Sequence, residues 1–277
     1  MITELVQTTD GVTVGLHHLE PVAPPIAPVL LLLHGAFSGH TIWLRSFAAQ
    51  LANHGFDIWL ADFRGHGVAQ REAAPRSWWF DDLIERDAPA LIERLRAHIG
   101  SRPLGVIGHS AGGVVGLAAL ARAGAGPRWD ALVTLGTPGP SRMGLKRYVG
   151  AFGFRTLALA LGRFPARALR FGGDDEGALM FGQWMGWNLQ GRWPSRDGFD
   201  YLEALSRART PFLGVAGGRD LLFSPPYACR EIVERIGSPT KDFHIAPSLN
   251  HPGLVLDPRA ATEVVPPVVS WLKRVLQ

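Results

Sequence analysis

The chain has 277 residues, of which 47% are hydrophobic and 19% charged, values that exclude a disordered or fibrous protein. The net charge is +4. The single cysteine, Cys229, excludes an intramolecular disulfide and is typical of a reducing compartment, so we expect a cytoplasmic protein. The first residues have no basic run before an apolar stretch, and the longest apolar runs fall short of the ~20 residues of a membrane span, so neither a signal peptide nor a membrane helix is expected.

Apolar runs of strand length alternate with amphipathic segments of helix length towards both ends of the chain. The expected strands are residues 12–18, 29–33, 56–61, 104–107, 131–135, 212–216 and 242–246. The expected helices are residues 42–54, 78–99, 111–123, 225–236 and 259–276, and Pro89 is expected to break or kink the second of them. This alternation predicts an α/β fold with a mostly parallel central sheet and helices on both of its faces.

The alternation lapses between Thr137 and Arg209, where the sequence has helical periodicity, frequent glycine and no convincing buried strand. We therefore expect an α/β core formed by residues 1–138 and 210–277. A helical cap or lid of residues 139–209 is expected to interrupt this core.

A serine motif follows the strand expected at 104–107. The sequence Gly108-His109-Ser110-Ala111-Gly112 has the pattern G-x-S-x-G between a strand and a helix, which exposes a serine hydroxyl on a strained turn. Glycine is needed on both sides because larger residues would clash with the strand and the helix. Ser110 is the predicted nucleophile, and the N–H of Ala111 can point at a developing oxyanion. The alternative is an ordinary glycine-rich loop. His109 is expected to be a packed or loop-bracing neighbour and not a catalyst.

A second glycine-containing loop, residues 34–39, follows the strand expected at 29–33. Residues just after such a His-Gly pair can supply a second oxyanion N–H, here from Ala36. Phe37 beside it, and His109 beside the nucleophile, are candidate substrate contacts. His34 is expected to brace the loop and not to carry protons.

Three motifs occur in one order along the chain: His34-Gly35, Asp62-Phe63-Arg64-Gly65-His66-Gly67 and the serine motif. On these motifs the chain resembles the α/β-hydrolase fold family, in particular its serine esterases and lipases, with a cap inserted after the sixth strand. Residues 51–60 are further similar to acid-lipase-like members. The resemblance covers residues 1–138 and 210–277. It implies that Asp62, Arg64 and His66 brace the loops around the site, although they could be taken for a second acid–base set.

In this family the catalytic residues follow the order serine, acid, histidine. Downstream of Ser110 only two histidines remain. His244 lies in the strand expected at 242–246, whereas His251 lies in the loop after it and can swing over the edge of the sheet. We therefore predict His251 as the general base that takes the serine proton.

An acid must orient the base. Asp220 follows the strand expected at 212–216 and lies at the same edge of the sheet, so we predict it as the third member of a triad. The alternatives, Asp242 and Asp257, are expected to be solvated or to cap other elements. Cys229 has no partner histidine nearby in the sequence and is expected to be inert.

No set of histidines or acids has the spacing of a metal site, and the glycines at 105 and 108 lack the rest of a dinucleotide fingerprint. We therefore expect no metal and no cofactor.

The insertion carries a local positive charge. Between Ser141 and Gly173 there is no acid and there are seven basic residues: Arg142, Lys146, Arg147, Arg155, Arg163, Arg167 and Arg170. Such a pattern, interleaved with large apolar residues, can rest on an anionic lipid surface as a peripheral membrane contact, or beside an acidic partner. We favour the alternative that the arginines face solvent while the apolar face covers the site. Nucleic-acid binding is disfavoured.

Further along the insertion, Met180, Trp184 and Trp187 share one helical face. Core packing explains such a stripe most often. In an insertion above a catalytic serine, however, the face can line an acyl pocket, and we predict these three residues as substrate contacts.

The sequence thus predicts a serine hydrolase that cleaves carboxylic esters, a small-molecule substrate, with apolar acyl or alkyl groups. The alternatives with the same triad are an acyltransferase, a thioesterase or a peptidase. An aminopeptidase needs carboxylates near the site, and in the cap only Asp174, Asp175 and Glu176 could serve. A non-catalytic ligand-binding protein of this fold is disfavoured because all three triad candidates are present. The sequence predicts neither the physiological ester nor the oligomeric state.

Overall fold

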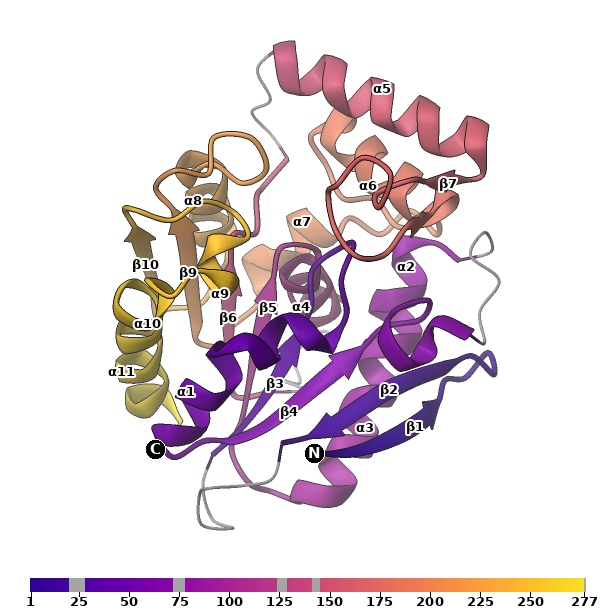
Figure 1. The fold of residues 1–277 in the computed structure, drawn as a ribbon. Coiled ribbons are helices and arrows are strands. Elements are labelled where there is room, and N and C mark those ends of the chain that lie inside the picture. Colours follow the sequence, from indigo (N-terminus) through magenta and orange to yellow (C-terminus); the bar gives the residue numbers. More distant parts are fainter. Residues whose placement is uncertain (20–27, 72–77, 124–128, 141–144, 277) are drawn as a thin grey trace.

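The computed structural model describes residues 1–19, 28–71, 78–123, 129–140 and 145–276, and its centre is an eight-stranded sheet (Figure 1). The strand order is β1-β2-β4-β3-β5-β6-β9-β10. The strands are β1 (Ile2–Gln7), β2 (Thr13–His18), β3 (Val29–Leu33), β4 (Asp57–Asp62), β5 (Leu104–His109), β6 (Ala131–Leu135), β9 (Phe212–Gly217) and β10 (Lys241–Ala246). From β4 to β10 all neighbours are parallel, while β1 and β2 add an antiparallel edge.

All seven expected strands are present, and the predicted fold class is confirmed. The edge strand β1 was not predicted. Only Val6 of its six residues is buried, so its sequence lacks the apolar run that identifies the inner strands. Its register is set by its pairing with β2.

Helices cover both faces of the sheet. The helical elements of the core are η1 (His40–Arg45), α1 (Phe47–Asn53), η2 (Gly67–Arg71), α2 (Phe80–Asp82), η3 (Leu83–Asp87), α3 (Ala88–Ile99), α4 (Ala111–Arg122), α8 (Pro226–Arg235), α9 (Gly253–Leu256), α10 (Ala260–Glu263) and α11 (Val265–Val275). Alternate residues of β3 enter two apolar clusters. Leu31 and Leu33 pack in the cluster that includes α3 and α4, whereas Leu30 and Leu32 pack in the cluster that includes α1 and α11. The fully buried strand therefore has the continuous apolar sequence from which it was predicted.

The helix that contains Pro89 is continuous but irregular. The helical run from Phe80 to Ile99 contains a π-helical turn, η3, directly before the proline. Proline lacks an N–H, and its ring would clash with the carbonyl of Glu85, four residues earlier and inside that turn. The position of the π-helical turn is consistent with this effect of proline, while the expected break or kink itself stays a prediction.

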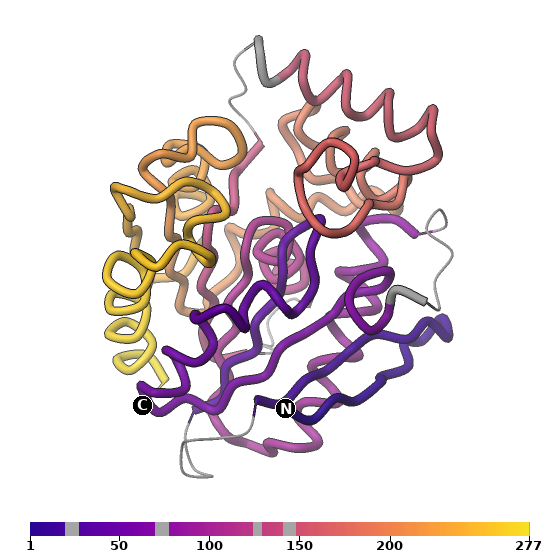
Figure 2. The backbone as a smooth tube through the Cα atoms, viewed as in Figure 1, coloured from indigo at the N-terminus to yellow at the C-terminus, as the bar shows by residue number. Residues whose placement is uncertain are grey.

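Between β6 and β9 the chain forms a separate group of elements, and we call its residues 145–209 the cap segment. Its elements are α5 (Leu145–Leu161), β7 (Arg163–Phe164), β8 (Glu176–Gly177), α6 (Ala178–Gln190), α7 (Tyr201–Ala204) and η4 (Leu205–Arg207). Figures 1 and 2 show α5 and α6 at the end of the molecule towards which β9 and β10 point. The short antiparallel pair β7–β8 was not predicted. Within the described residues, no helix is long and apolar enough to cross a membrane.

Candidate active site

Ser110 lies on the sharp turn between β5 and α4. Its φ of 52° is in the left-handed region, where a residue with a side chain is strained. The turn is held by the N–H of Ser110, which donates to Leu135 O at 2.9 Å, and by the hydroxyl of Thr137, which donates to Ser110 O at 3.1 Å. The serine is thus fixed at the carboxyl end of the central strand, in the conformation that the G-x-S-x-G pattern predicts.

The glycines of the motif are required by close backbone contacts. A Cβ on Gly112 would lie 2.4 Å from the carbonyl oxygens of Leu33 and His34, and a Cβ on Gly108 would lie 2.5 Å from the backbone of Gly113. The clash argued from the sequence is therefore present on both sides of Ser110.

We expect Gly112→Ala to destabilise the protein by about 3 kcal/mol and to lower the predicted ester hydrolysis, because the turn must shift to admit the methyl group. The matched control is Gly153→Ala on α5, where an added Cβ meets nothing within 4 Å. Alanine there should stabilise the helix by up to ~1 kcal/mol. Urea unfolding of both variants measures the difference, and equal stabilities would contradict the clash.

The predicted base and acid are hydrogen-bonded to each other. His251 Nδ1 donates to Asp220 Oδ2 at 2.7 Å, and Asp220 also accepts the N–H of Phe223 at 3.0 Å. Burial opposes ionisation of Asp220, but the hydrogen bond and charge of His251 hold the pKa of this carboxyl below its ordinary value. The bond fixes the proton on Nδ1 and leaves Nε2 of His251 to accept another proton.

The loops after β5, β6, β9 and β10 bring this pair beside the serine turn. The ring of His251 lies 4.9 Å from that of His109, the neighbour of Ser110, and 5.1 Å from that of Phe223. A Cβ on Gly136, which follows β6, would lie 3.1 Å from His251 Nδ1. The three predicted triad residues thus gather at one edge of the sheet, and their catalytic role stays a prediction.

The alternative acids and the second histidine have other partners. Asp242 accepts hydrogen bonds from the Trp271 indole at 3.0 Å and from Arg274 at 2.6 Å. Asp257 pairs with Arg259. His244 lies on β10, as expected, where its Nε2 donates to the carbonyl of Glu263 at 2.8 Å.

A small cavity lies beside the turn that carries Ser110, with Ala111 on its wall. Its free space for a water-sized group is about 10 Å³, and it is lined by His34, Gly35, Ala36, Phe63, His66, Leu83, Ala111, Val115, Glu176 and Met180. Both predicted oxyanion residues, Ala36 and Ala111, are on its wall. Its volume is below the roughly 300–1,000 Å³ that drug-sized ligands occupy.

His34 supports the loop that carries Ala36. Its Nδ1 donates to Gly35 O at 2.8 Å and its Nε2 accepts the N–H of Phe63 at 3.1 Å. Burial and the nearby charge of His66 lower the pKa of His34 to about 4, so it is neutral at pH 7. The bracing role expected from the sequence agrees with these contacts.

His109 is likewise neutral, because burial and the charge of His251 lower its pKa to about 3. Its Nε2 donates to the carbonyl of His251 at 3.2 Å and so supports the loop of the predicted base. Its contact with substrate stays a prediction.

The cap segment holds the loop of Ala36 through backbone bonds. The carbonyl of Phe37 accepts the N–H groups of Gly173 at 2.9 Å and Asp174 at 3.0 Å, and the N–H of Phe37 donates to Glu176 Oε1 at 2.8 Å. Phe37 has a φ of 66°, a strained value. Its ring meets aromatic rings of the cap segment at 5.5–6.2 Å: Phe164, Phe171 and Phe181. The conformation of this loop therefore depends on the cap segment.

Glu176 also pairs with His66, whose Nε2 lies 3.1 Å from Oε1. Both side chains are buried. Burial alone would lower the pKa of His66, but the charge and hydrogen bond of Glu176 raise it to about 9. Sequence reasoning gave Glu176 no role except as a possible carboxylate of a peptidase, because its partners lie in loops more than a hundred residues away.

We expect this pair to make stability depend on pH. The pKa of His66 in the folded protein, about 9, exceeds its ordinary value of 6.5, so the fold favours the protonated form. The resulting stabilisation, on the order of 3 kcal/mol, is complete below pH 6.5 and is lost as the pH rises through about 9. Chemical unfolding across this range should show a larger loss for the wild type than for His66→Gln. Equal losses would contradict the assignment.

The predicted stripe on α6 divides between two environments. Met180 is buried on the cavity wall. Trp184 is half-buried and packs against Phe80 and Phe181 at about 6 Å. Trp187 is buried, and its indole donates to Pro194 O at 2.7 Å. Among the described residues only Met180 of the three lines this cavity, and contact of all three with substrate stays a prediction.

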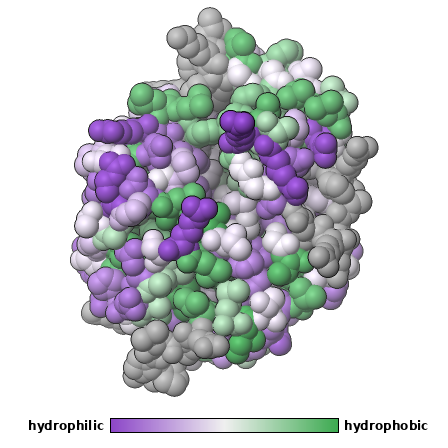
Figure 3. Space-filling model, in the orientation of Figure 1, coloured by the Kyte–Doolittle hydropathy of each residue, from purple (hydrophilic) through white to green (hydrophobic). Residues whose placement is uncertain are grey.

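The described arginines of the basic insertion, Arg155, Arg163, Arg167 and Arg170, are exposed. Arg142 and the side chains of Lys146 and Arg147 lie outside the described part of the chain. Large apolar side chains on α5 are exposed as well: Tyr148, Val149, Phe152, Leu159 and Leu161. Figure 3 shows hydrophobic residues along the upper edge of the molecule, where α5 lies. Solvent-facing arginines were expected, but the apolar residues of α5 do not all turn inward.

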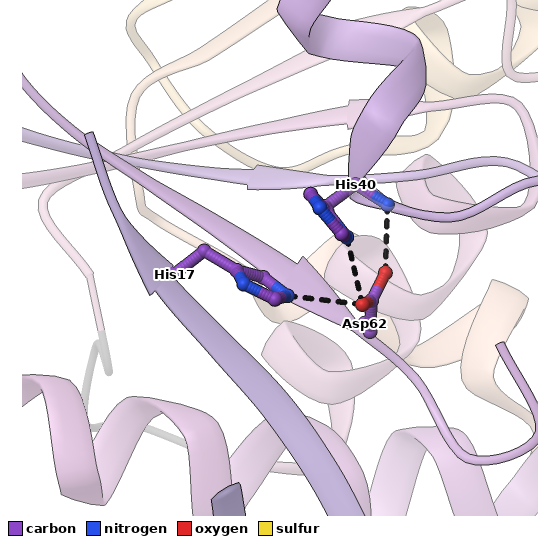
Figure 4. A group of neighbouring side chains, drawn as sticks. All are labelled: His17, His40 and Asp62. Carbon is purple, nitrogen blue, oxygen red and sulfur yellow. Dashed lines mark hydrogen bonds and ion pairs between the residues drawn. The ribbon is translucent and has the colours of Figure 1, made fainter. Parts of the chain in front are cut away.

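Three buried residues form a polar cluster below the site (Figure 4). His17 Nε2 lies 2.9 Å and His40 Nδ1 2.8 Å from Asp62 Oδ2, and Asp62 also accepts the N–H groups of His40 and Val68. Burial alone would raise the pKa of Asp62, but the hydrogen bonds from the two histidines hold it well below its usual range. One nitrogen of each histidine and one carboxylate oxygen of Asp62, the atoms that could bind a metal ion, lie within 4.8 Å of one another. The separations are those of hydrogen bonds, however, and we assign the cluster to bracing β2 against the loops after β3 and β4.

Arg64 joins the same loop to the rest of the core. Its guanidinium pairs with Asp87 at 2.7 Å and with Asp10 at 2.9 Å. With Asp62 and His66, it ties the loop after β4 to other elements, as the sequence resemblance implied.

Comparison with known proteins identifies the family. A family model described as the alpha/beta hydrolase fold matches residues 28–178, more than half of the chain. Curated relatives include a tear acid lipase-like protein of Mesocricetus auratus, 32% identical over 38% of this chain, and gastric triacylglycerol lipase of Homo sapiens, 35% identical over 33% of it. These matches cover 29% and 26% of the relatives' own lengths.

Solved structures resemble the whole fold at low sequence identity. The esterase Pf2001 of Pyrococcus furiosus superposes with a TM-score of 0.65 at 18% identity, covering 100% of this chain and 93% of that one. DcsB, solved in complex with a substrate analogue, superposes with a TM-score of 0.70 at 18% identity and covers 99% of both chains. The family match, the sheet topology and the strained serine turn agree, and the chain belongs to the α/β-hydrolase fold family, with lipases among its curated relatives.

Proposed function

We propose that the protein is a serine hydrolase that cleaves carboxylic esters with apolar acyl or alkyl groups. The observation that carries the proposal is the 2.7 Å hydrogen bond between His251 and Asp220, placed beside the strained turn of Ser110. Ester-cleaving relatives and a mostly apolar cavity next to the nucleophile support it.

In the proposed mechanism Ser110 Oγ attacks the ester carbonyl while His251 Nε2 takes the serine proton. Asp220 keeps the other ring proton on Nδ1 and stabilises the imidazolium. The N–H groups of Ala36 and Ala111 stabilise the oxyanion. His251 then returns the proton to the leaving alcohol, and water, activated by the same histidine, hydrolyses the acyl-enzyme to release the acid and restore the serine.

A panel of p-nitrophenyl esters from acetate to hexadecanoate tests the proposal through kcat/KM. Because the cavity is small, we expect the highest values for short and medium chains, with a decline for hexadecanoate. Activity that is confined to amides or thioesters would contradict ester cleavage as the function. Activity that rises up to hexadecanoate would instead require the cap segment to move away from the site.

A further inference from the structure

The two carboxylate oxygens of Glu176 have unequal surroundings. Oε1 accepts the N–H of Phe37 at 2.8 Å and faces Nε2 of His66 at 3.1 Å. Oε2 is buried and has no hydrogen-bond partner among the described residues. A buried carboxylate oxygen without a donor is costly, because it has left water without gaining a replacement bond. Such an exception in a folded protein calls for an explanation, and a ligand is one.

The position of Glu176 indicates which ligand. Glu176 is on the wall of the cavity that also contains Ala36 and Ala111, the predicted oxyanion residues. The rest of that wall is mainly apolar, with Met180 and Val115 among its residues. An acyl group bound at Ser110 and entering this narrow cavity would approach Glu176, the lining residue that carries the unpaired acceptor.

The charge of the site favours a neutral donor. The pKa of His66 is raised to about 9, so the imidazolium beside Oε1 already balances the carboxylate at neutral pH. A substrate ammonium would therefore gain little net attraction while losing its hydration. A hydroxyl group loses less on burial and can donate to Oε2.

We propose that Glu176 Oε2 accepts a hydrogen bond from a hydroxyl on the acyl chain, which makes hydroxyacyl esters the preferred substrate class. The inference rests on the proposed ester hydrolysis at Ser110 and specifies its substrate. Glu176 is in this account a specificity residue. It takes no part in proton transfer.

The test compares ethyl hexanoate with ethyl 3-hydroxy-, 5-hydroxy-, 3-oxo- and 5-oxohexanoate, with kcat/KM measured by proton release. Each value is divided by the rate of alkaline hydrolysis to remove intrinsic reactivity. In the wild type, the hydroxy ester whose oxygen reaches Glu176 should exceed ethyl hexanoate by roughly tenfold to a hundredfold. The keto ester of the same position should fall below ethyl hexanoate, because its oxygen cannot donate.

Glu176→Gln separates recognition from a merely structural role. The amide oxygen can still accept from Phe37, which turns the NH₂ group into the cavity in place of Oε2. The kcat/KM of the keto ester, relative to that of ethyl hexanoate, should then rise by roughly tenfold over its wild-type value. Glu203→Gln, an exposed change of the same chemistry on α7, should leave every ratio unchanged.

The outcomes are distinct. If the wild type hydrolyses ethyl hexanoate but prefers neither the 3-hydroxy nor the 5-hydroxy ester to it, this inference is overturned. The proposed function is unaffected by that result. The inference is also overturned if Glu176→Gln leaves the kcat/KM of the keto ester, relative to that of ethyl hexanoate, unchanged. If the wild type hydrolyses no ester in the series, both this inference and the proposed function are contradicted. If Glu176→Gln does not fold, the wild-type comparison still decides.

Discussion

Replacing Ser110 by alanine is expected to lower kcat for p-nitrophenyl butyrate by about 10⁶-fold, since no other group can form the acyl-enzyme. The change removes one oxygen and keeps a side chain at the strained φ of 52°, so the fold should persist. Residual turnover from the oxyanion N–H groups and from substrate binding should remain roughly 10³–10⁴-fold above the reaction in water.

Ser206→Ala is the matched control for this variant. Ser206 is exposed in the η4 turn of the cap segment, and its hydroxyl donates to the carbonyl of Glu203 at 2.9 Å. Its kcat should equal that of the wild type. If Ser110→Ala retained more than a few per cent of wild-type activity while remaining folded, a different nucleophile would have to be sought.

The second large effect is expected for Asp220→Asn, about 10⁴-fold in kcat. Asparagine has the shape of aspartate, but its NH₂ group can donate to His251 Nδ1, which moves the ring proton to Nε2. The base then cannot accept the proton of Ser110, and the imidazolium loses its counter-charge. A hydrogen bond between residues 220 and 251 should persist with its direction reversed, so the free energy of unfolding should change much less than kcat.

Asp242→Asn provides the comparison, because Asp242 was the alternative acid in the sequence. Its carboxylate is about half exposed and binds Trp271 and Arg274. We expect kcat to stay within a factor of about two, as for surface changes remote from the chemistry. A larger loss in Asp242→Asn than in Asp220→Asn would reverse the assignment of the acid.

The inner strands and the serine turn could be predicted because their causes are local. A strand buried on both faces needs a continuous apolar run, as in β3, and the turn at Ser110 needs glycine where backbone approaches within 2.5 Å. The His251–Asp220 pair could be predicted because both residues follow parallel strands, whose carboxyl ends lie at one edge of the sheet.

The features that were missed depend on partners distant in the sequence. β1 has one buried residue and forms through its pairing with β2. Glu176 meets Phe37 across 139 positions and His66 across 110, and nothing in the residues around Glu176 indicates either contact. The stripe on α6 was correctly placed on a helix, but the periodicity could not separate Met180 on the cavity wall from Trp187 in the packed interior.

The central claim, that Ser110 is a nucleophile activated by His251, is tested most directly by labelling with a fluorophosphonate. Intact mass and peptide mapping should find a single adduct on Ser110, absent in Ser110→Ala and formed far more slowly in His251→Ala. An adduct on another residue, or an esterase that stays active and unlabelled, would contradict the account.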